Sequence, residues 1–425
     1  MTLSGRLSAI VGPSHVSADP DVLAARCVDW TGRYHGAATL LVRPGNADEV
    51  AAVLTTCREA GAYVTVQGGR TSLVAGTVPE HDDVLLSTER LTDLSPVDVT
   101  GRRVHAGAGV TAAAVQTAAA AAGLLFGVDL SSRDSATVGG MASTDAGGLH
   151  TVRYGTMRAQ VLGLDVALPD GSLVPTHPDP HMFVGAEGTL GVITAVDLRL
   201  HPIPQHRATA LCGFTDLDSL VSTARTFLDI DATDALELID GRAVGADDNW
   251  LLLVELAGAT DQTERLADAL TDTPGEPAVG VDAAGRQRLW QVRESLAEIV
   301  GRYGPPLKFD VSLPLPEIGA FAAESARLIA QYAPEAIPVL FGHVGEGNLH
   351  LNVLRCDSAA EAAIYPPMMT LIAAHGGNVT SEHGVGSRKR AYLSMARSEA
   401  EITAMRAVKT ALDPGGFLNA AVLFD

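Results

Sequence analysis

The stretch Ser135-Ala-Thr-Val-Gly-Gly-Met-Ala-Ser-Thr-Asp-Ala-Gly-Gly148 is the part of the sequence that says most about the fold. Together with the residues before it from Gly127, it is rich in glycine and small hydroxyl side chains and has almost no bulk. A loop of this length without structure of its own is usually functional. Such a backbone can lie flat against a large planar ligand, so we expect an extended ligand-binding loop here.

Two other glycine patterns precede this stretch. Gln67-Gly-Gly-Arg-Thr-Ser-Leu-Val-Ala-Gly76 follows a predicted strand, and its glycines let backbone N–H groups cradle a diphosphate, with a tight loop between strands as the alternative. Gly107-Ala-Gly109-Val-Thr-Ala112 fits the dinucleotide pattern G-x-G-x-x-A. We interpret it as a false match, because Thr111 as a helix N-cap explains the local sequence.

Pro202 and Pro204 mark a boundary in the chain, because two prolines this close stop a helix and disfavour a central strand. Before them strands, helices and glycine turns alternate, including a helix over 48–60 with Asn46 or Asp48 as N-cap. Beyond them, strands are predicted at 208–214, 234–239, 250–256, 307–313, 337–343 and 349–354, and helices at 217–229, 261–271, 286–301, 316–332 and 399–411. This alternation predicts an α+β sandwich with an antiparallel sheet. We divide the chain into an N-terminal arm (1–35), a first domain (36–204), a second domain (205–398) and a C-terminal segment (399–425).

The composition excludes several classes of function. The 425 residues include 30 basic and 50 acidic side chains, a formal net charge of −20, which repels nucleic acid. The sequence starts without a secretory signal and has no apolar stretch of the about 18 residues that a membrane span needs. The four cysteines form no C-x-x-C pair. We expect a cytoplasmic protein without a transmembrane segment, whose site must supply its own positive charge if the substrate is an anion.

The strongest chemical signal is Ile337-Pro-Val-Leu-Phe-Gly-His-Val-Gly-Glu-Gly-Asn-Leu-His-Leu-Asn-Val353, in which two apolar runs flank a hairpin turn. His343 ends one predicted strand and His350 begins the next, so a tight turn would bring both imidazoles to one face. Asn352 shares the face of His350 by period-2 alternation. Two convergent histidines favour a divalent metal such as zinc or manganese. The alternative is that each histidine simply caps a strand end.

A third ligand is offered by Val379-Thr-Ser-Glu-His-Gly-Val-Gly386. Glu382 would complete a His-His-Glu set that leaves coordination positions open, as in catalytic metal sites, with His383 beside the metal. The alternative is a solvated glutamate and an ordinary loop histidine. Arg293 on an amphipathic helix and Lys308 at a strand start are normally read as solvated side chains. In a chain this acidic, they would supply the local positive potential that an anionic substrate needs.

The motifs together resemble a known family. The two quoted glycine stretches, Tyr154-Gly155 and Val184-Gly-Ala-Glu-Gly-Thr-Leu-Gly-Val-Ile193 occur in the order found in the FAD domain of the vanillyl-alcohol oxidase/p-cresol methylhydroxylase superfamily. Within it the chain resembles, over about residues 37–420, the FAD-linked D-2-hydroxyacid dehydrogenases: D-lactate dehydrogenase, the glycolate oxidase FAD subunit and D-2-hydroxyglutarate dehydrogenase. The resemblance implies an α+β fold. It comprises a two-subdomain FAD-binding domain of the p-cresol methylhydroxylase type, an α+β cap domain with an antiparallel sheet, and a C-terminal segment that returns to the flavin.

The resemblance also implies the site residues. His343, His350 and Glu382 match the family's metal ligands, His383 its catalytic residue on the substrate side, and Arg293, Lys308 and Asn352 its substrate-binding residues. The FAD contacts that it implies are Gly68, Gly69, Arg70, Thr71, Ser72, Gly76, Ser135, Thr137, Gly139, Gly140, Ser143, Thr144, Ala146, Gly148, Glu187, Gly188, Gly191, Ile193 and Asn419. The sequence departs from the family at Arg70 and Ser72, where glycine is usual, and at Asp145, where asparagine is usual. It also lacks the Pro-Gly-Lys that usually follows the position of Asn419.

We therefore expect an FAD-dependent, metal-assisted oxidation of a small anionic D-2-hydroxy acid (lactate, glycolate or 2-hydroxyglutarate class) to the 2-oxo acid. The FAD is expected to be non-covalent, because no histidine stands at position 70 for attachment. One divalent metal is expected, Zn²⁺ or else Mn²⁺. His383 accepts the hydroxyl proton. Electrons pass to a separate acceptor such as a quinone or an electron-transfer flavoprotein, and a homodimer is one assembly to consider. The alternatives are a zinc-dependent hydrolase with the glycine loops as scaffold, and a non-catalytic nucleotide-binding module.

Overall fold

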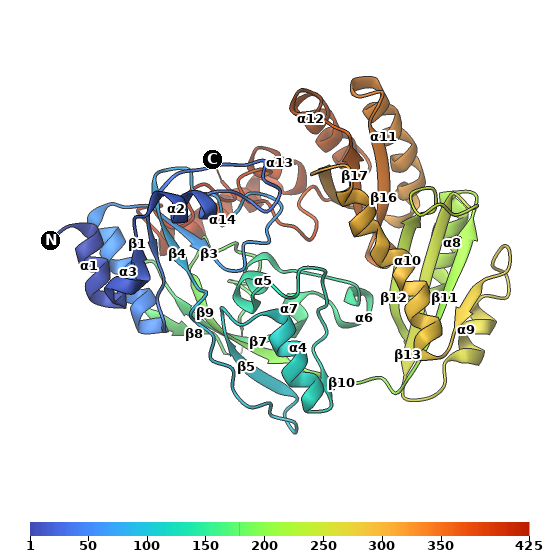
Figure 1. The fold of residues 1–425 in the computed structure, drawn as a ribbon, viewed down its shortest axis with the longest axis horizontal. Helices are drawn as coiled ribbons and strands as arrows, with labels where there is room; N and C mark the ends of the chain where they lie inside the picture. Colours follow the sequence, from blue (N-terminus) through green and yellow to red (C-terminus); the bar gives the residue numbers. More distant parts are fainter. Residues whose placement is uncertain (178, 425) are drawn as a thin grey trace. The chain divides into compact units, whose positions relative to one another are not determined.

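The chain forms two compact units in the computed structural model, which describes residues 1–177 and 179–424 (Figure 1). Unit 1 comprises residues 1–147, 155–203 and 383–425, and unit 2 comprises residues 148–154 and 204–382. The chain leaves unit 1 between Ile203 and Pro204, within the proline pair of the sequence. Residues 383–398, which the sequence grouped with the second domain, cluster with unit 1.

Unit 1 begins with a four-stranded sheet in the order β1-β2-β4-β3, in which β4 pairs in parallel with β2 and β3. Its elements are α1 (Leu3–Val11), η1 (Pro13–His15), β1 (Val16–Ser17), α2 (Pro20–Arg26), β2 (Ala38–Val42), α3 (Ala47–Ala60), β3 (Val64–Gln67) and β4 (Asp83–Ser87). Asn46 rather than Asp48 caps α3, because its Oδ1 accepts from the Glu49 N–H at 2.9 Å. Gly61 ends the helix in the left-handed conformation (φ 65°).

The first 35 residues are part of this unit. Strand β1 pairs with β2, and Leu7 and Val11 of α1 lie in the same buried cluster as Val42. The sequence suggested an arm because two helices this short carry little periodic signal. Their apolar side chains are nevertheless buried, which ties the segment to the unit.

The second sheet of unit 1 is antiparallel, in the order β5-β9-β7-β8. Its elements and their neighbours are β5 (Arg103–Gly107), α4 (Ala112–Ala121), β6 (Leu124–Leu125), α5 (Val138–Thr144), α7 (Met157–Gln160), β7 (Val161–Ala167), β8 (Leu173–Pro175), β9 (Val192–Arg199) and β10 (His201–Pro202). The pattern at 107–112 is a false match for a dinucleotide fingerprint, as interpreted. β5 pairs with an antiparallel neighbour, and the Thr111 hydroxyl caps α4 by accepting from the Ala114 N–H at 3.2 Å.

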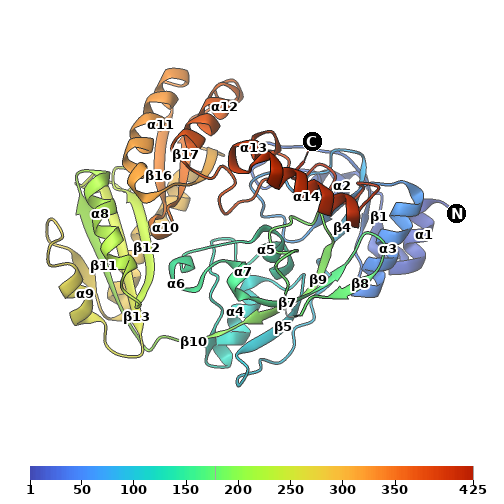
Figure 2. The same ribbon diagram turned by 180° about the vertical axis from the view of Figure 1, so that it is seen from behind.

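The chain ends in unit 1 with η4 (Arg390–Tyr392), α13 (Leu393–Ala396) and α14 (Glu399–Leu412). Ser398 and Glu401 form a capping box at the start of α14, which is drawn in red in Figure 2. After α14, the Asn419 N–H donates to the Val64 carbonyl at 2.8 Å, so the last turn is attached to β3.

Unit 2 is built on a seven-stranded sheet in the order β14-β11-β13-β12-β16-β17-β15, with every pairing antiparallel. This confirms the expected fold class. The strands are β11 (His206–Phe214), β12 (Thr233–Asp240), β13 (Trp250–Gly258), β14 (Ala278–Gly280), β15 (Leu307–Ser312), β16 (Ile337–His343) and β17 (Asn348–Leu354). The helices are α6 (Thr151–Tyr154), α8 (Leu217–Leu228), α9 (Thr263–Ala269), α10 (Ala283–Gly301), η2 (Leu315–Glu317), α11 (Ile318–Tyr332), η3 (Val344–Glu346) and α12 (Ser358–Ala374).

Both faces of this sheet are covered, because every residue of β12 is buried. Helix α10 contributes Leu296 and Val300 to the buried cluster that contains Ile239, Leu253 and Phe341, which places it on the face carrying the side chains discussed below. Helix α12 was not predicted, because Pro366 and Pro367 lie inside it.

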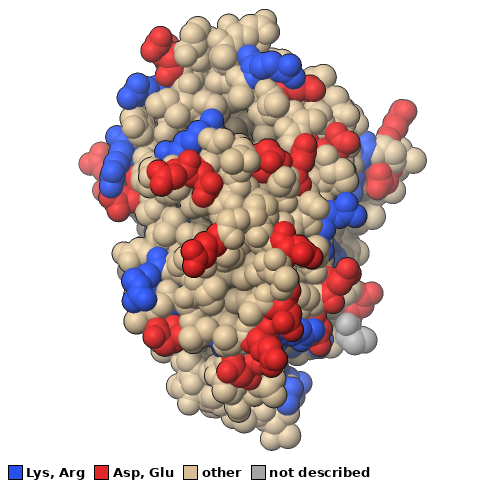
Figure 3. All heavy atoms as spheres, turned by 90° about the vertical axis from the view of Figure 1, so that its right-hand side faces the viewer, with Lys and Arg blue, Asp and Glu red and all other residues tan. Residues whose placement is uncertain are grey.

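On the face shown in Figure 3, Lys and Arg are interspersed with Asp and Glu, and charges of one sign form no extended patch. A broad basic surface of the kind that binds nucleic acid is not seen on that face. Within residues 1–177 and 179–424, no helix combines the length and the apolar character needed to cross a bilayer.

Candidate active site

The hairpin of β16 and β17 brings the two predicted histidine ligands together. In its register His343 pairs with Asn348, and Phe341 pairs with His350. Gly347 closes the turn in the left-handed region (φ 69°), where a Cβ would lie 2.1 Å from the Leu313 carbonyl oxygen. The imidazoles of His343 and His350 meet edge to face with centroids 5.4 Å apart, on one face of the sheet as the spacing predicted.

Glu382 faces both imidazoles. Its Oε1 lies 3.9 Å from His343 Nε2 and 3.6 Å from His350 Nε2. Two ligand atoms that each bind a zinc ion at about 2.1 Å in tetrahedral geometry lie about 3.4 Å apart. Glu382 Oε1 is therefore close enough to each imidazole nitrogen for the two to share a divalent metal ion. The group whose potential ligand atoms all lie within 4.8 Å of one another includes His350 and Glu382 but not His343.

Each histidine has its other ring nitrogen on a buried carboxylate. His343 Nδ1 lies 2.5 Å from Glu237 Oε1, and His350 Nδ1 lies 3.1 Å from Asp310 Oδ1. Both carboxylate side chains are essentially inaccessible to solvent, at 0% and 1% exposed. A carboxylate on one ring nitrogen fixes the tautomer and aims the lone pair of the other, as is usual for metal-binding histidines. The sequence reasoning missed both carboxylates as part of this site.

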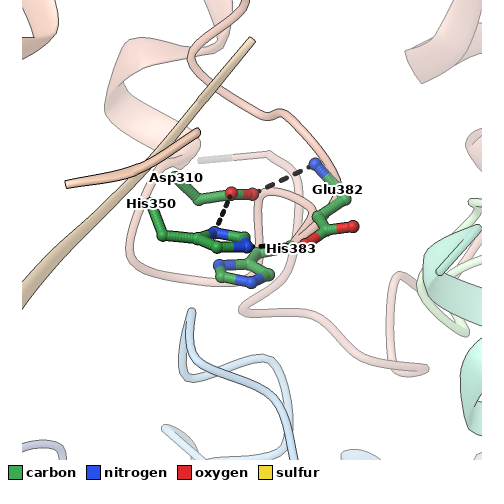
Figure 4. Close-up of side chains that lie close together, drawn as sticks. All are labelled: Asp310, His350, Glu382 and His383. Carbon is green, nitrogen blue, oxygen red and sulfur yellow. Dashed lines mark hydrogen bonds and ion pairs between the residues drawn. The ribbon is translucent and has the colours of Figure 1, made fainter. Parts of the chain in front are cut away.

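Asp310, His350, Glu382 and His383 form a group whose potential ligand atoms all lie within 4.8 Å of one another (Figure 4). The Asp310 carboxylate also accepts from the Glu382 backbone N–H at 3.1 Å. One Asp310 oxygen contacts the His350 ring and the other contacts the Glu382 backbone. We therefore expect Asp310 to orient these two residues and not to bind the metal itself. His383 directly follows Glu382, where the chain passes from unit 2 to unit 1.

The buried charges shift each other's titration. Burial alone would lower the pKa of His343, but the Glu237 carboxylate outweighs burial and raises that pKa to about 9. Burial likewise opposes ionisation of Glu237, yet His343 and Arg293 lower its pKa to about 2. Glu346, in the hairpin turn, has its pKa raised to about 7, chiefly by burial. Burial and the neighbouring carboxylates thus act in opposite directions on His343, and a metal ion would bind only its neutral form.

The predicted substrate-binding residues lie on the same face. Arg293, on α10, donates from Nε to Glu237 Oε2 at 2.6 Å, and its Cζ lies 4.7 Å from the Phe341 ring centroid. Lys308 pairs with Asn352 in the register of β15 and β17, next to the pair of Asp310 and His350. Burial lowers the pKa of Lys308, partly offset by Asp310. Unit 2 thus brings together Arg293, Lys308, Asn352 and the three predicted metal ligands.

In unit 1 the two predicted glycine stretches pack against each other. A Cβ on Gly69 would lie 2.0 Å from the Ser135 carbonyl oxygen, and a Cβ on Gly68 would lie 2.6 Å from Thr137 Oγ1. Only glycine permits this approach. The two stretches that are predicted to bind FAD are therefore held side by side by backbone contacts.

The second glycine stretch is not wholly a loop. Residues Val138–Thr144 form helix α5, capped by the Thr137 hydroxyl, so the expectation of one long unstructured segment is wrong. Gly139 serves packing, because a Cβ there would lie 2.5 Å from Ala108 Cβ. Two adjacent glycines have poor helix propensity, which hid the helix from the sequence pattern.

Glu187 and Asn419 hold loops of unit 1 in place. The half-buried Glu187 carboxylate accepts from the N–H groups of Val385 and Gly386 at 2.8 and 2.7 Å, which fixes the loop after His383. The Asn419 amide accepts from the Val66 N–H and donates to the Glu187 carbonyl, both at 2.8 Å. Their predicted roles toward FAD remain predictions.

Two of the departures from the family, at Arg70 and Asp145, can be described from the local structure, and nothing in the structure explains Ser72. Arg70 adopts φ 57° and donates to the Ala25 carbonyl at 2.8 Å, which shows why glycine suits that position. Asp145 adopts φ 53° after α5 and pairs with Arg158 Nε at 2.9 Å. Direct FAD contacts also remain predictions for Gly68, Gly69, Thr71, Ser72, Gly76, Ser135, Thr137, Gly139, Gly140, Ser143, Thr144, Ala146, Gly148, Gly188, Gly191 and Ile193.

Comparison with known proteins covers both units. Residues 38–177 match the family model described as FAD binding domain, and residues 203–423 match the model described as FAD linked oxidases, C-terminal domain. A D-2-hydroxyglutarate dehydrogenase of Stutzerimonas stutzeri is 29% identical over 99% of this chain and 98% of its own length. The mitochondrial D-2-hydroxyglutarate dehydrogenase of Bos taurus is 33% identical over 96% of this chain and 81% of its own.

Among solved structures, p-cresol methylhydroxylase with substrate bound matches with a TM-score of 0.82 at 16% identity, over 100% of this chain and 96% of that one. At this identity the match concerns the fold. Together, these matches confirm the resemblance inferred from the ordered motifs.

Proposed function

The chain belongs to the FAD-linked oxidase family, and from that premise we propose that it oxidises a D-2-hydroxy acid to the 2-oxo acid with the help of one divalent metal ion. The observation that carries the metal-assisted part is the convergence of His343 Nε2 and His350 Nε2 on Glu382 Oε1. Matches to both domain models favour this function over a zinc hydrolase and over a non-catalytic nucleotide-binding module.

Each residue has a definite task in this proposal. His343, His350 and Glu382 would hold the metal, which supplies Lewis-acid polarisation of the substrate hydroxyl. His383 accepts the hydroxyl proton, as an imidazole can near neutral pH. Arg293, Lys308 and Asn352 bind carboxylate oxygens and fix which face of C2 is presented. The glycine-lined backbone of unit 1 binds FAD non-covalently, and bound FAD supplies the hydride acceptor.

We favour 2-hydroxyglutarate among the candidate substrates. Two relatives carry that substrate in their names, and a guanidinium together with an ammonium on one sheet face can neutralise a dicarboxylate. A separate electron acceptor reoxidises the flavin in this proposal. Localisation in the cytoplasm stays a prediction, and the cattle relative is a mitochondrial protein.

The test is a panel of D- and L-2-hydroxy acids with an artificial electron acceptor. We expect turnover with D-2-hydroxyglutarate, less with D-lactate and glycolate, and none with L-isomers. His383→Ala should lower kcat by about 10²–10⁴-fold while metal and flavin contents stay near wild type. No turnover with any D-2-hydroxy acid would refute the proposal, and loss of metal from His383→Ala would make His383 a ligand instead of the base.

A second assay examines the flavin linkage. Acid precipitation of the purified protein should release the yellow chromophore into the supernatant. Colour that remained in the pellet would refute non-covalent binding.

A further inference from the structure

Glu237 occupies a position between two functional side chains of unit 2. It lies on β12, opposite His343 in the register with β16, and its side chain is 0% exposed. One carboxylate oxygen lies 2.5 Å from His343 Nδ1, and the other accepts from Arg293 Nε at 2.6 Å. A single buried carboxylate therefore touches both a predicted metal ligand and a predicted substrate-binding residue.

We propose that Glu237 is a positioning residue that couples the metal site to the binding of the substrate carboxylate. This inference rests on the proposed function, since it takes His343 as a metal ligand and Arg293 as a substrate-binding residue. Glu237 touches neither metal nor substrate and acts through these two side chains.

The geometry requires a carboxylate at this position. Both neighbours are donors. His343 must keep its hydrogen on Nδ1 if the lone pair of Nε2 is to bind a metal ion shared with Glu382, and Arg293 Nε always carries a hydrogen. A carboxylate offers two acceptors, one for each. An amide offers one acceptor and one donor, so a glutamine would satisfy one neighbour and oppose the other. If the amide donated to Nδ1, the histidine hydrogen would move to Nε2 and block the metal.

The same contact aims Arg293. Glu237 engages Nε, which leaves the terminal nitrogens of the guanidinium to form a fork to a substrate carboxylate. The Phe341 ring lies under the guanidinium, 4.7 Å from Cζ, and restricts it on a second side. Only 11% of the Arg293 side chain is exposed, so without Glu237 a buried cation would lose its partner.

Asp310 provides a matched control. It is equally buried and accepts from the other predicted ligand, His350, through Oδ1 at 3.1 Å. Its second oxygen accepts from the Glu382 backbone N–H at 3.1 Å rather than from Arg293. Asp310→Asn should therefore disturb the metal site without changing the orientation of the Arg293 guanidinium.

The experiment compares wild type, Glu237→Gln, Glu237→Asp and Asp310→Asn as metal-stripped, FAD-loaded enzymes. Zn²⁺ affinity is titrated against a chromophoric chelator, and KM and kcat are then measured at saturating Zn²⁺. Glu237→Gln and Asp310→Asn should each weaken Zn²⁺ binding by about 10–100-fold. At saturating Zn²⁺, Glu237→Gln should raise KM for the hydroxy acid by about 10-fold or more. Asp310→Asn should raise it by a clearly smaller factor, because Asp310 influences the Lys308 charge but accepts no hydrogen bond from Arg293. Glu237→Asp, which keeps both acceptors, should recover part of both losses.

The outcomes separate the inference from the function on which it rests. A Glu237→Gln enzyme with wild-type Zn²⁺ affinity and wild-type KM overturns the inference. Equal KM increases in Glu237→Gln and Asp310→Asn overturn it too, because they indicate general disruption. A wild-type enzyme that binds no Zn²⁺ refutes the metal in the proposed function, and the KM comparison then still tests the contact with Arg293. If Glu237→Gln does not fold, failure of Glu237→Asp to bind Zn²⁺ better than Asp310→Asn overturns the inference.

Discussion

The two units build their candidate sites in opposite ways. In unit 1 the two stretches predicted to bind the cofactor approach each other through backbone, which is possible because Gly68 and Gly69 have no side chains. In unit 2 the site is made of side chains on one sheet face, held by the buried carboxylates of Glu237 and Asp310. A side chain added to Gly68 or Gly69 should therefore disturb unit 1. Truncation of a site side chain in unit 2 should abolish catalysis without loss of bound flavin.

The largest effect is expected from removing a metal ligand. His350→Ala should lower kcat by about 100-fold or more, because a bound metal contributes several kcal/mol of charge stabilisation. Metal content should fall, while flavin content stays near wild type. The matched control is His375→Ala, since His375, which directly follows α12, pairs with Glu317 of η2 in the same unit. Full activity in a metal-free His350→Ala enzyme would remove the metal from the mechanism. It would also contradict the expectation that catalysis depends on the side chains of unit 2.

A second effect concerns the stability of unit 2. Asp234 is fully buried, with His150 Nδ1 and Arg153 Nη1 each 3.1 Å from its carboxylate and Arg207 also paired to it. Asp234→Asn removes the negative charge that these three side chains share, although Arg207 keeps its pair with Glu255, and should cost about 3 kcal/mol. Thermal melting followed by intrinsic fluorescence measures the loss, with Glu298→Gln, an exposed pair with Arg302, as a control that changes little.

The stabilisation by Asp234 depends on pH in a direction set by the shift of its pKa. Burial opposes ionisation of Asp234, but His150 and the two arginines lower its pKa from 3.8 to about 2. Its stabilising contribution is therefore present above pH 3.8 and is lost as the pH falls toward 2. The wild type and Asp234→Asn should converge in melting temperature over that range. A constant difference down to pH 2 would contradict the assignment.

Unit 1 should be sensitive to a single added methyl group. In Gly69→Ala the new Cβ would lie 2.0 Å from the Ser135 carbonyl oxygen, so the two glycine stretches must separate. We expect a loss of about 1–3 kcal/mol and a reduced flavin-to-protein absorbance ratio. Gly5→Ala, whose Cβ would meet its nearest atom at 3.4 Å in α1, should be neutral or slightly stabilising. Unchanged flavin content in Gly69→Ala would show that the approach of these two stretches does not shape the cofactor surface.

The sequence could predict those site residues whose positions depend on local strand and turn geometry. His343 and His350 were found because strand alternation and a glycine turn determine which side chains share a face. Glu237 and Asp310 were missed because they are 106 and 40 residues from their histidines. A signal was present, since each acidic residue has apolar residues of its strand on both sides, in Ala235-Leu-Glu-Leu-Ile239 and Phe309-Asp-Val311. An acid in such a position has to have a partner.

Helices α12 and α5 were missed for different reasons. In α12 Pro366 and Pro367 argue against a helix locally, but Ile364, Met368 and Ile372 are fully buried, and packing outweighs local preference. In α5 the glycines suppress the helix signal, although Thr137 as N-cap would have indicated where it starts. Local rules therefore predict strands and turns here better than helices whose side chains are chosen for close packing.

The smallest effect, at Arg70, tests whether unit 1 depends on backbone even where a large side chain stands. Arg70 holds φ 57°, which costs an ordinary residue about 1–2 kcal/mol relative to glycine. Glycine offsets about 0.5–1 kcal/mol of this gain in folding free energy, because its unfolded chain has more conformational freedom to lose. Arg70→Gly should therefore be about 1 kcal/mol more stable than Arg70→Ala, since both lose the bond to the Ala25 carbonyl and only alanine keeps the backbone strain. Both variants should retain flavin, because the loop would contact it through main-chain groups. A fall in flavin content in both variants would instead make the guanidinium a cofactor contact, and unit 1 would then rely on a side chain as unit 2 does.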